Sequence, residues 1–225
     1  MKHFLFLALF LPSFLAAQQQ RGSAFFHGSR LEKNIALTFD ACPSSTRGGF
    51  DRQIVQTLID SNVSATFFLS GRWVAAHPND ARWLASIPLF ELGNHSYTHP
   101  HMTEISDEKI VEELTKTQQR IFKTTGIMPA LFRPPYVEMN AALISIADSL
   151  RLHIVMYDLA SGDPDTNITA QRMIPYVVSS ARNGSIIVMH VNGRGWHTAE
   201  ALPSIIAGLK KRGFRFVNVS GLLQH

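Results

Sequence analysis

The sequence predicts an α/β fold in which seven parallel strands alternate with helices and form a barrel. Two observations support this fold class. Short β-rich runs alternate with longer amphipathic runs along the chain, and polar residues gather where the predicted strands end. Strict alternation favours parallel strands joined by helical crossovers. Seven strands suit a barrel better than a flat sheet, although the alternation alone also permits a doubly wound sheet.

The predicted strands are 35–40, 65–69, 89–92, 130–133, 153–157, 186–190 and 214–219. The predicted helices lie near 50–60, 73–85, 106–124, 139–151, 169–182 and 198–212. The helix at 106–124 has the clearest signals, because Ser106 can cap it and Gly126 and Pro129 can end it. Four apolar residues form its expected buried face: Ile110, Leu114, Ile121 and Phe122.

Composition bounds the function as well as the fold. The chain has 225 residues, 45% of them hydrophobic, which suits one barrel-sized domain. Its formal charge is +4, and removing residues 1–20, which carry Lys2 and no acidic residue, lowers this to +3. So small and scattered a charge argues against nucleic-acid binding. A single cysteine excludes a disulfide within the chain.

Residues 1–17 have the features of a secretory signal peptide. Lys2 lies near the start, an apolar run covers 4–11, and the small residues Ala16 and Ala17 precede a polar stretch. The run is short for a membrane-spanning helix, and an uncleaved anchor is the alternative. We therefore expect a signal peptide at 1–17, an N-terminal lead-in at 18–33 and one domain at 34–225. The mature protein would be exported to the periplasm or secreted, with no stable membrane span.

Ionisable residues occur at or just after several predicted strand ends: Asp40, His95, His99, Arg133, Asp163 and His190. In a parallel α/β barrel the carboxyl ends of all strands meet at one rim, where active sites are built. Each residue also has a structural interpretation when taken alone. His190 could be a core histidine, Arg133 a partner in a structural ion pair, and Asp163 a turn residue.

Five motifs change this balance by their order and spacing: "TFDACP", "HSYTHP", "FRPPY", "YDLASGDPD" and "IIVMH". From about Asn34 to the C-terminus, the chain resembles the polysaccharide deacetylase family, also called the NodB-homology domain. The resemblance implies an incomplete or distorted (β/α)7 barrel. It also implies hydrolysis of N-acetyl or O-acetyl groups of polysaccharides with a divalent metal, commonly zinc.

The resemblance further implies catalytic roles. Asp40 would be the general base and His190 the general acid. Arg133 would hold the carboxylate of Asp40, and Asp163 would orient His190 and raise its pKa. The backbone N–H of Tyr136 would donate to the oxyanion that forms during acyl transfer.

The same resemblance implies binding roles. His95 and His99 would be metal ligands, four residues apart, a spacing that can bring two imidazoles to one metal. Val188 would face the methyl group of the acetyl substituent. Pro135 and Tyr136 would form part of the substrate pocket.

The chain departs from the family at the first motif. Ala41 stands where the family usually has a second aspartate that completes the metal site, which leaves two protein ligands. Water, Asp40 or the thiolate of Cys42 could take the open position, and Cys42 itself replaces a usual glycine. Val137 replaces another glycine, and Pro164 replaces a tryptophan.

The predicted function is that of an exported deacetylase acting on an N-acetylated glycan, such as peptidoglycan or a chitin-like poly-N-acetylglucosamine. Two alternatives remain open. One is a carbohydrate-binding pseudoenzyme that lost its metal with the aspartate at position 41. The other is a hydrolase of another carbon–nitrogen bond, such as a cyclic imide or ureide. The sequence specifies no oligomeric state.

Overall fold

A computed structural model describes residues 24–43 and 49–224. The predicted signal peptide at 1–17 and the lead-in residues 18–23 lie outside the described residues. The described chain forms one curved sheet, in which every strand pair is parallel. The strand order is β1-β6-β5-β4-β3-β2-β8-β7, with β9 added beside β2. β1 and β7 end this order without pairing with each other, which confirms the predicted incomplete barrel.

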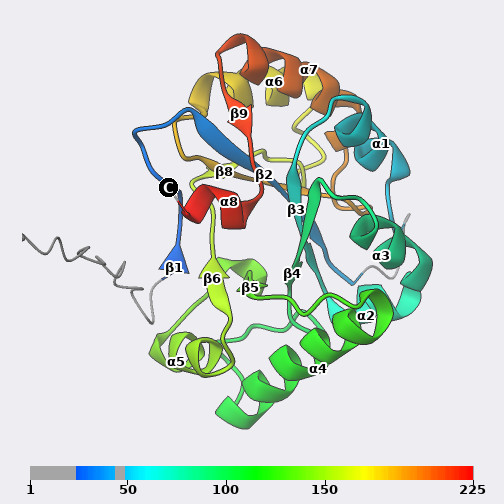
Figure 1. Cartoon of the computed structure of the whole chain (residues 1–225), viewed down its shortest axis with the longest axis vertical. Coiled ribbons are helices and arrows are strands. Elements are labelled where there is room, and N and C mark those ends of the chain that lie inside the picture. The colour runs from blue at the N-terminus through cyan, green and yellow to red at the C-terminus, as the bar shows by residue number, and fades with distance from the viewer. Residues whose placement is uncertain (1–23, 44–48, 225) are drawn as a thin grey trace, which may run out of the picture.

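The strands are β1 (Ala24–Phe25), β2 (Asn34–Ala41), β3 (Ala65–Leu69), β4 (Phe90–Asn94), β5 (Leu131–Phe132), β6 (His153–Val155), β7 (Leu159–Ala160), β8 (Ile186–His190) and β9 (Arg215–Phe216). The helices are α1 (Arg52–Asp60), α2 (Gly71–Ala76), α3 (Pro78–Ala85), α4 (Asp107–Thr125), α5 (Ala141–Ser149), α6 (Ala170–Ser180), α7 (Thr198–Lys211) and α8 (Val219–Leu223), with a 3₁₀ turn at Pro135–Val137. Most helices cover the outer face of the curved sheet (Figure 1). None of the described helices is both long and apolar enough to span a bilayer.

All seven predicted strands are present, and two short strands are added. β1 lies within the predicted lead-in and pairs with β6, and β7 pairs with β8. The strand expected at 214–219 is shorter, because β9 ends at Phe216 and α8 starts at Val219. The helix expected at 73–85 is two helices that meet at His77, because Pro78 begins a new helix at its first position.

The long helix α4 begins and ends as predicted. The side chain of Ser106 accepts a hydrogen bond from the N–H of Lys109, and Gly126 ends the helix in the left-handed conformation with φ 78°. Ile110, Leu114 and Ile121 are buried, but Phe122 is exposed, so its predicted place on the buried face is wrong. Phe122 lies at the edge of the helix face formed by Ile110, Leu114 and Ile121. A residue at the edge of an apolar face can be buried or exposed, and its spacing in the sequence does not decide which.

Side chains of β2 alternate between two environments, as the pleat of a strand requires. Leu37, Phe39 and Ala41 belong to the main core between the sheet and its outer helices. Ala36 belongs to a second apolar cluster, with inward-facing residues of β3 and β8 and with α8. Asp40 lies four residues after Ala36 on the same side of the strand, and it lines a cavity.

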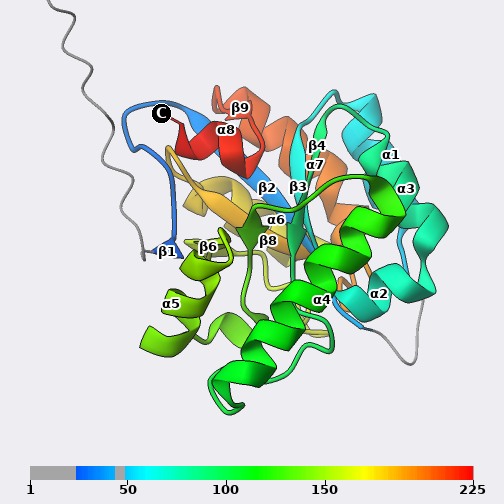
Figure 2. The same ribbon diagram turned by 60° about the horizontal axis from the view of Figure 1, so that its bottom comes forward.

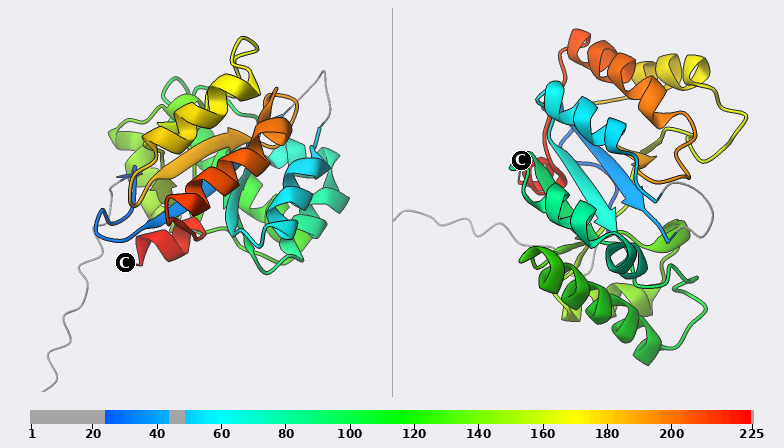
Figure 3. Two further views of the ribbon diagram at one scale, coloured as in Figure 1. Left: turned by 90° about the horizontal axis from the view of Figure 1, so that it is seen from above. Right: turned by 90° about the vertical axis from the view of Figure 1, so that its right-hand side faces the viewer.

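The interior of the barrel therefore changes character along its axis. α8 lies at one end of the barrel (Figures 2 and 3). There Val219 and Leu222 belong to one apolar cluster with Ala36 and Ile186, so this end is filled with apolar side chains. At the carboxyl ends of the strands the interior is open and polar. Strand β8 shows this change within five residues. Its first residue, Ile186, belongs to the apolar cluster, and its last, His190, lines the cavity.

Candidate active site

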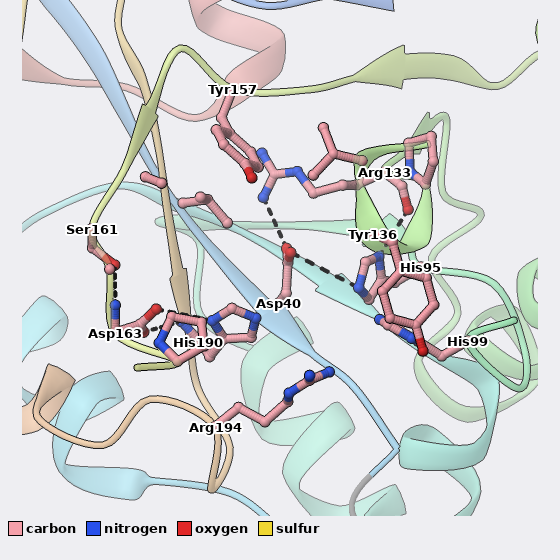
Figure 4. A pocket seen from close by; sticks show the side chains of 16 residues that line it. Asp40, His95, His99, Arg133, Tyr136, Tyr157, Ser161, Asp163, His190 and Arg194 are labelled. Carbon is pink, nitrogen blue, oxygen red and sulfur yellow. Dashed lines mark hydrogen bonds and ion pairs between the residues drawn. The ribbon is translucent and has the colours of Figure 1, made fainter. Parts of the chain in front are cut away.

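A cavity of about 310 Å³ opens at the carboxyl ends of the strands (Figure 4). Its lining includes most of the ionisable residues expected at the site: Asp40, His95, His99, Arg133, Asp163 and His190. Tyr136 and Val188 line it as well, whereas Pro134 does so in place of Pro135. Pro135 is buried in the 3₁₀ turn.

Asp40 and Arg133 form a buried ion pair. Nη1 of Arg133 donates to Oδ1 of Asp40 over 2.8 Å and to the hydroxyl of Thr38 over 2.8 Å. The remaining guanidinium donors reach the carbonyls of Val155 at 3.2 Å and Met156 at 3.0 Å. Each of the three guanidinium nitrogens of this 1% exposed arginine thus donates at least one hydrogen bond. Burial alone would raise the pKa of Asp40, but the charges of Arg133, His95 and His190 lower it overall.

His95 and His99 come from the end of β4 and the loop that follows it. Nδ1 of His95 lies 2.8 Å from the carbonyl oxygen of Arg133, so the ring donates there and its Nε2 points into the site. The two imidazole centroids are 4.9 Å apart. Ser96 and His99 both have positive φ, 59° and 63°, which folds the loop back on itself. The carboxylate of Glu113 on α4 accepts hydrogen bonds from two backbone N–H groups of this loop.

Cys42 brings a sulfur atom to the same two rings. Its Sγ lies 3.7 Å from Nε2 of His95 and 3.4 Å from Nε2 of His99. Within residues 24–43 and 49–224, these three residues are the group whose ligand atoms all lie within 4.8 Å of one another. Burial would raise the pKa of Cys42, yet hydrogen bonds from His190, His95 and His99 hold it well below the usual range. Two imidazole nitrogens beside one thiol of lowered pKa fit a divalent metal such as zinc.

His190 is paired with Asp163. Nδ1 of His190 lies 3.0 Å from Oδ1 of Asp163. The other carboxylate oxygen accepts from the backbone N–H of His190 at 2.6 Å and from the hydroxyl of Thr198 at 2.7 Å. Burial would lower the pKa of His190, but the charge of Asp163 and its hydrogen bond raise it to about 10. The imidazole is therefore protonated at neutral pH, with its Nε2 facing the cavity (Figure 4).

Tyr136 lies at the rim of the cavity, and its side chain is 48% exposed. The ring stacks on His101 at a centroid distance of 4.0 Å and meets the edge of His99 at 4.7 Å. Tyr136 and Val137 have positive φ, 55° and 62°. Positive φ is uncommon outside glycine and strained for a β-branched residue, which explains why glycine is the usual residue at position 137.

The structure thus gathers the predicted site residues and adds others that the sequence did not single out. Thr38, Glu113 and Thr198 are buried and bond directly to Arg133, to the histidine loop and to Asp163. Thr38 could have been found from its period-two relation to Asp40 on one strand. Glu113 carries no signal in the sequence, because it lies within a helix rich in polar residues. Thr198 carries none, because a threonine at the first turn of a helix is common.

Comparison with known proteins gives the family. The family model described as "Polysaccharide deacetylase" matches residues 27–155. The chain belongs to this family, which confirms the predicted resemblance. The family is one of hydrolases, and N-deacetylation breaks a carbon–nitrogen bond.

Individual relatives differ in length and in activity. A bifunctional xylanase/deacetylase of Pseudobutyrivibrio xylanivorans is 34% identical over 210 residues, which are 93% of this chain but 34% of that protein. The chain thus spans about a third of the length of that relative. A peptidoglycan-N-acetylglucosamine deacetylase of Bacillus cereus is 32% identical over 196 residues, covering 86% of this chain and 90% of the relative. A family 4 carbohydrate esterase pseudoenzyme of Bacillus anthracis superposes with a TM-score of 0.81 at 28% identity, covering 89% of this chain and 69% of that one.

Proposed function

We propose that the protein is a metal-dependent deacetylase that hydrolyses N-acetyl groups of a glycan. One observation carries this proposal: an acid and a base lie side by side at the end of the cavity, on adjacent strands. Asp40 on β2 and His190 on β8 are partners in the strand register. Asp40 is held as a carboxylate and His190 as an imidazolium. Hydrolysis of an amide needs both states at once, one group to take a proton and one to give it.

The proposed metal site includes His95 and His99. A divalent ion bound there would polarise the acetyl carbonyl and acidify water. Cys42 and Asp40 are the candidates for a further ligand.

The chain's own residues divide the proton transfers. Asp40 takes a proton from the attacking water, while Arg133 keeps its carboxylate in place through the 2.8 Å contact. His190 gives its Nε2 proton to the leaving nitrogen, so the products are an amine and acetate. The N–H of Tyr136 donates to the oxyanion, and Val188 contacts the acetyl methyl group. General acid and general base catalysis each contribute about 10²-fold to 10⁴-fold.

The proposed substrate is an N-acetylated polysaccharide outside the cytoplasm, with peptidoglycan or a poly-N-acetylglucosamine as the leading candidates. The Bacillus cereus relative, which matches this chain over most of its own length, is named for peptidoglycan N-acetylglucosamine. Export through the signal peptide at 1–17 would bring the protein to such a substrate. A mature N-terminus near Gln18, found by mass spectrometry of the exported protein, would support this.

Acetate release from a panel of acetylated chitooligosaccharides, peptidoglycan and acetylxylan tests the function. Each substrate is assayed with the metal-free protein and after addition of zinc. We expect zinc-dependent release from the N-acetylated substrates, and loss of most of it in Asp40→Asn and in His190→Ala. The exposed residues Asp148 and His153 provide matched controls, Asp148→Asn and His153→Ala.

One alternative has support from a particular observation. Ala41 leaves the first motif without its second carboxylate, and one structural relative is a pseudoenzyme. A pseudoenzyme would bind chitooligosaccharides without releasing acetate from any substrate at any metal concentration. The retained pair of Asp40 and His190 favours the enzyme, because binding alone requires no acid and base.

A further inference from the structure

The chain turns toward the histidines at Cys42, directly after β2. Ala41 packs among the side chains of the main core, whereas Asp40 and Cys42, two residues apart, both face the site. The position of Cys42 is fixed, because its carbonyl accepts a 2.7 Å hydrogen bond from the amide of Asn192. Cys42 is only 1% exposed, so its sulfur is shielded from solvent.

The two sulfur–nitrogen separations in this group match those of a zinc site. In a tetrahedral site with bonds of about 2.0–2.1 Å to nitrogen and about 2.3 Å to sulfur, nitrogen and sulfur lie about 3.6 Å apart. Sγ of Cys42 lies 3.7 Å from Nε2 of His95 and 3.4 Å from Nε2 of His99. These distances bracket the expected value. The sulfur of Cys42 therefore lies at a distance from each imidazole nitrogen that allows the two atoms to share one zinc ion.

Asp40 is the competing ligand and is held differently. Its Oδ1 accepts from Arg133 at 2.8 Å. Its Oδ2 lies 3.9 Å from Nε2 of His95. Asp40 is not a member of the group formed by Cys42, His95 and His99. An aspartate that bound the metal would also lose its freedom to accept a proton.

We propose that Cys42 is the third protein ligand of this site, so that one thiolate and two imidazoles hold the metal and Asp40 stays free. The inference rests on the metal dependence proposed above. It adds a ligand set and a class of metal. A thiolate selects zinc and similar borderline ions over magnesium, calcium and manganese, which prefer oxygen ligands. Three protein ligands leave the fourth position of a tetrahedral zinc site open for water or substrate.

The neighbouring contacts agree with this assignment. Nδ1 of His95 donates to the carbonyl of Arg133, which leaves Nε2 to bind the metal. Histidines that bind a metal through one ring nitrogen commonly donate a hydrogen bond from the other. Cys42 would bind the metal as a thiolate. The missing carboxylate at position 41 is thus replaced by an anionic ligand one residue further along.

Cobalt(II) spectroscopy of the metal-free full chain tests the proposal without relying on activity. We expect cobalt to produce a near-ultraviolet sulfur-to-cobalt charge-transfer band in the parent protein. The band should be absent in Cys42→Ser and in Cys42→Ala but present in Asp40→Asn. Zinc affinity, measured by competition with a chromophoric chelator, should fall in both Cys42 variants by more than about 100-fold, the upper end of the loss seen for second contacts. Excess magnesium should not displace the cobalt.

The outcomes separate this inference from the proposed function. Cobalt binding by the parent without a thiolate band overturns the ligand assignment but leaves a metal-dependent deacetylase. Loss of the metal in Asp40→Asn with full retention in Cys42→Ser makes Asp40 the ligand. Failure of the parent to bind cobalt or zinc, together with no acetate release, overturns both. The parent spectrum decides the assignment even where a Cys42 variant fails to fold.

Discussion

Asp163 serves two parts of the site with its two carboxylate oxygens. Oδ1 faces the ring of His190, whereas Oδ2 joins the backbone of β8 to Thr198 at the start of α7. The carboxylate is thus fixed on three sides, and the ring that it charges is fixed with it.

Asp163→Asn should change the pH profile of acetate release. The amide keeps the size of the side chain but removes the charge, so burial would then lower the pKa of His190 from its value of about 10. The acid form is present below the pKa and is lost as pH rises through it. The alkaline limb of kcat should therefore move to lower pH, and turnover at neutral pH should fall. Asp165→Asn, a change at an exposed neighbour, should leave the profile in place. An unchanged alkaline limb in Asp163→Asn would remove His190 as the acid.

Individual residues of the site differ in how far the sequence could predict them. Asp40, His95 and His190 follow apolar strand-like runs, so their place at the rim follows from the alternation of strands and helices. The sequence did not identify a third metal ligand. Whether residue 41 or residue 42 points toward the histidines depends on the backbone conformation at the end of β2, which the sequence pattern does not specify. Glu113 went unnoticed because an acid within a polar helix is usually exposed.

At the scale of elements, α4 acts on the site through the loop that precedes it. Glu113 on the buried face of α4 accepts from the N–H groups of Tyr97 and Thr98 at 2.8 and 2.7 Å and from the hydroxyl of Thr98 at 2.8 Å. These bonds hold the loop between the two histidines in its positive-φ form. The helix thereby sets the separation of the two imidazoles.

Glu113→Gln should weaken metal binding although Glu113 is not a ligand. The amide loses the charge that strengthens its bonds to the loop, so His99 would be held less firmly. We expect zinc affinity to fall by about 10-fold to 100-fold, measured by chelator competition. Glu112→Gln is the matched control, because Glu112 is its neighbour and pairs with Lys109 on the exposed face. Equal affinities of the two variants would show that the loop keeps its form without Glu113.

Val137→Gly should stabilise the fold. Val137 has φ 62° and is 37% exposed, so the change removes a strained side chain with little loss of burial. Relief of a left-handed conformation is worth about 1–2 kcal/mol, and the entropy of glycine offsets about 0.5–1 kcal/mol of it. Denaturant unfolding should show a gain of up to about 1.5 kcal/mol. Val137→Ala keeps the Cβ atom and should gain less, whereas a loss of stability in Val137→Gly would argue against strain.

The elements that the sequence missed share a physical cause. β1 and β7 have two residues each, too few to show any alternation, and exist because neighbouring strands β6 and β8 supply partners. The change from β9 to α8 occurs within one apolar run, where a strand and a buried helix look alike. The division of the helix expected at 73–85 is different, because the sequence does contain a signal for it. A proline such as Pro78 commonly begins a helix and interrupts one that precedes it.

At the scale of the whole molecule, residues 27–30 tie the open side of the barrel together. This segment follows β1 at one end of the sheet and bonds to the turn that precedes β8 near the other end. The N–H of Gly28 donates to the carbonyl of Gly184 at 2.8 Å, and Arg30 donates to the carbonyl of Asn183 at 2.6 Å and to Asp158 at 2.8 Å. The predicted lead-in therefore contributes to the sheet and its seam.

Gly184→Ala should destabilise the molecule through this seam. Gly184 has φ 74°, and a Cβ atom there would lie 2.5 Å from the carbonyl oxygen of Ser29 and 2.6 Å from that of Gly28. Backbone atoms cannot move aside as a flexible side chain can, so the segment would separate from β8. Gly126→Ala isolates the conformational part of the cost, because Gly126 has φ 78° but no atom within 4 Å of the added Cβ.

We expect Gly126→Ala to cost about 1–2 kcal/mol and Gly184→Ala at least about 3 kcal/mol, near the upper range for single substitutions. Denaturant unfolding of both variants beside the parent measures the difference. Because β8 carries His190, the Gly184 variant should also lose acetate release in proportion to the fraction unfolded, whereas the Gly126 variant should keep it. Equal losses of stability in the two variants would mean that residues 27–30 can leave the seam without cost, and that the sheet from β6 to β8 holds its curvature alone.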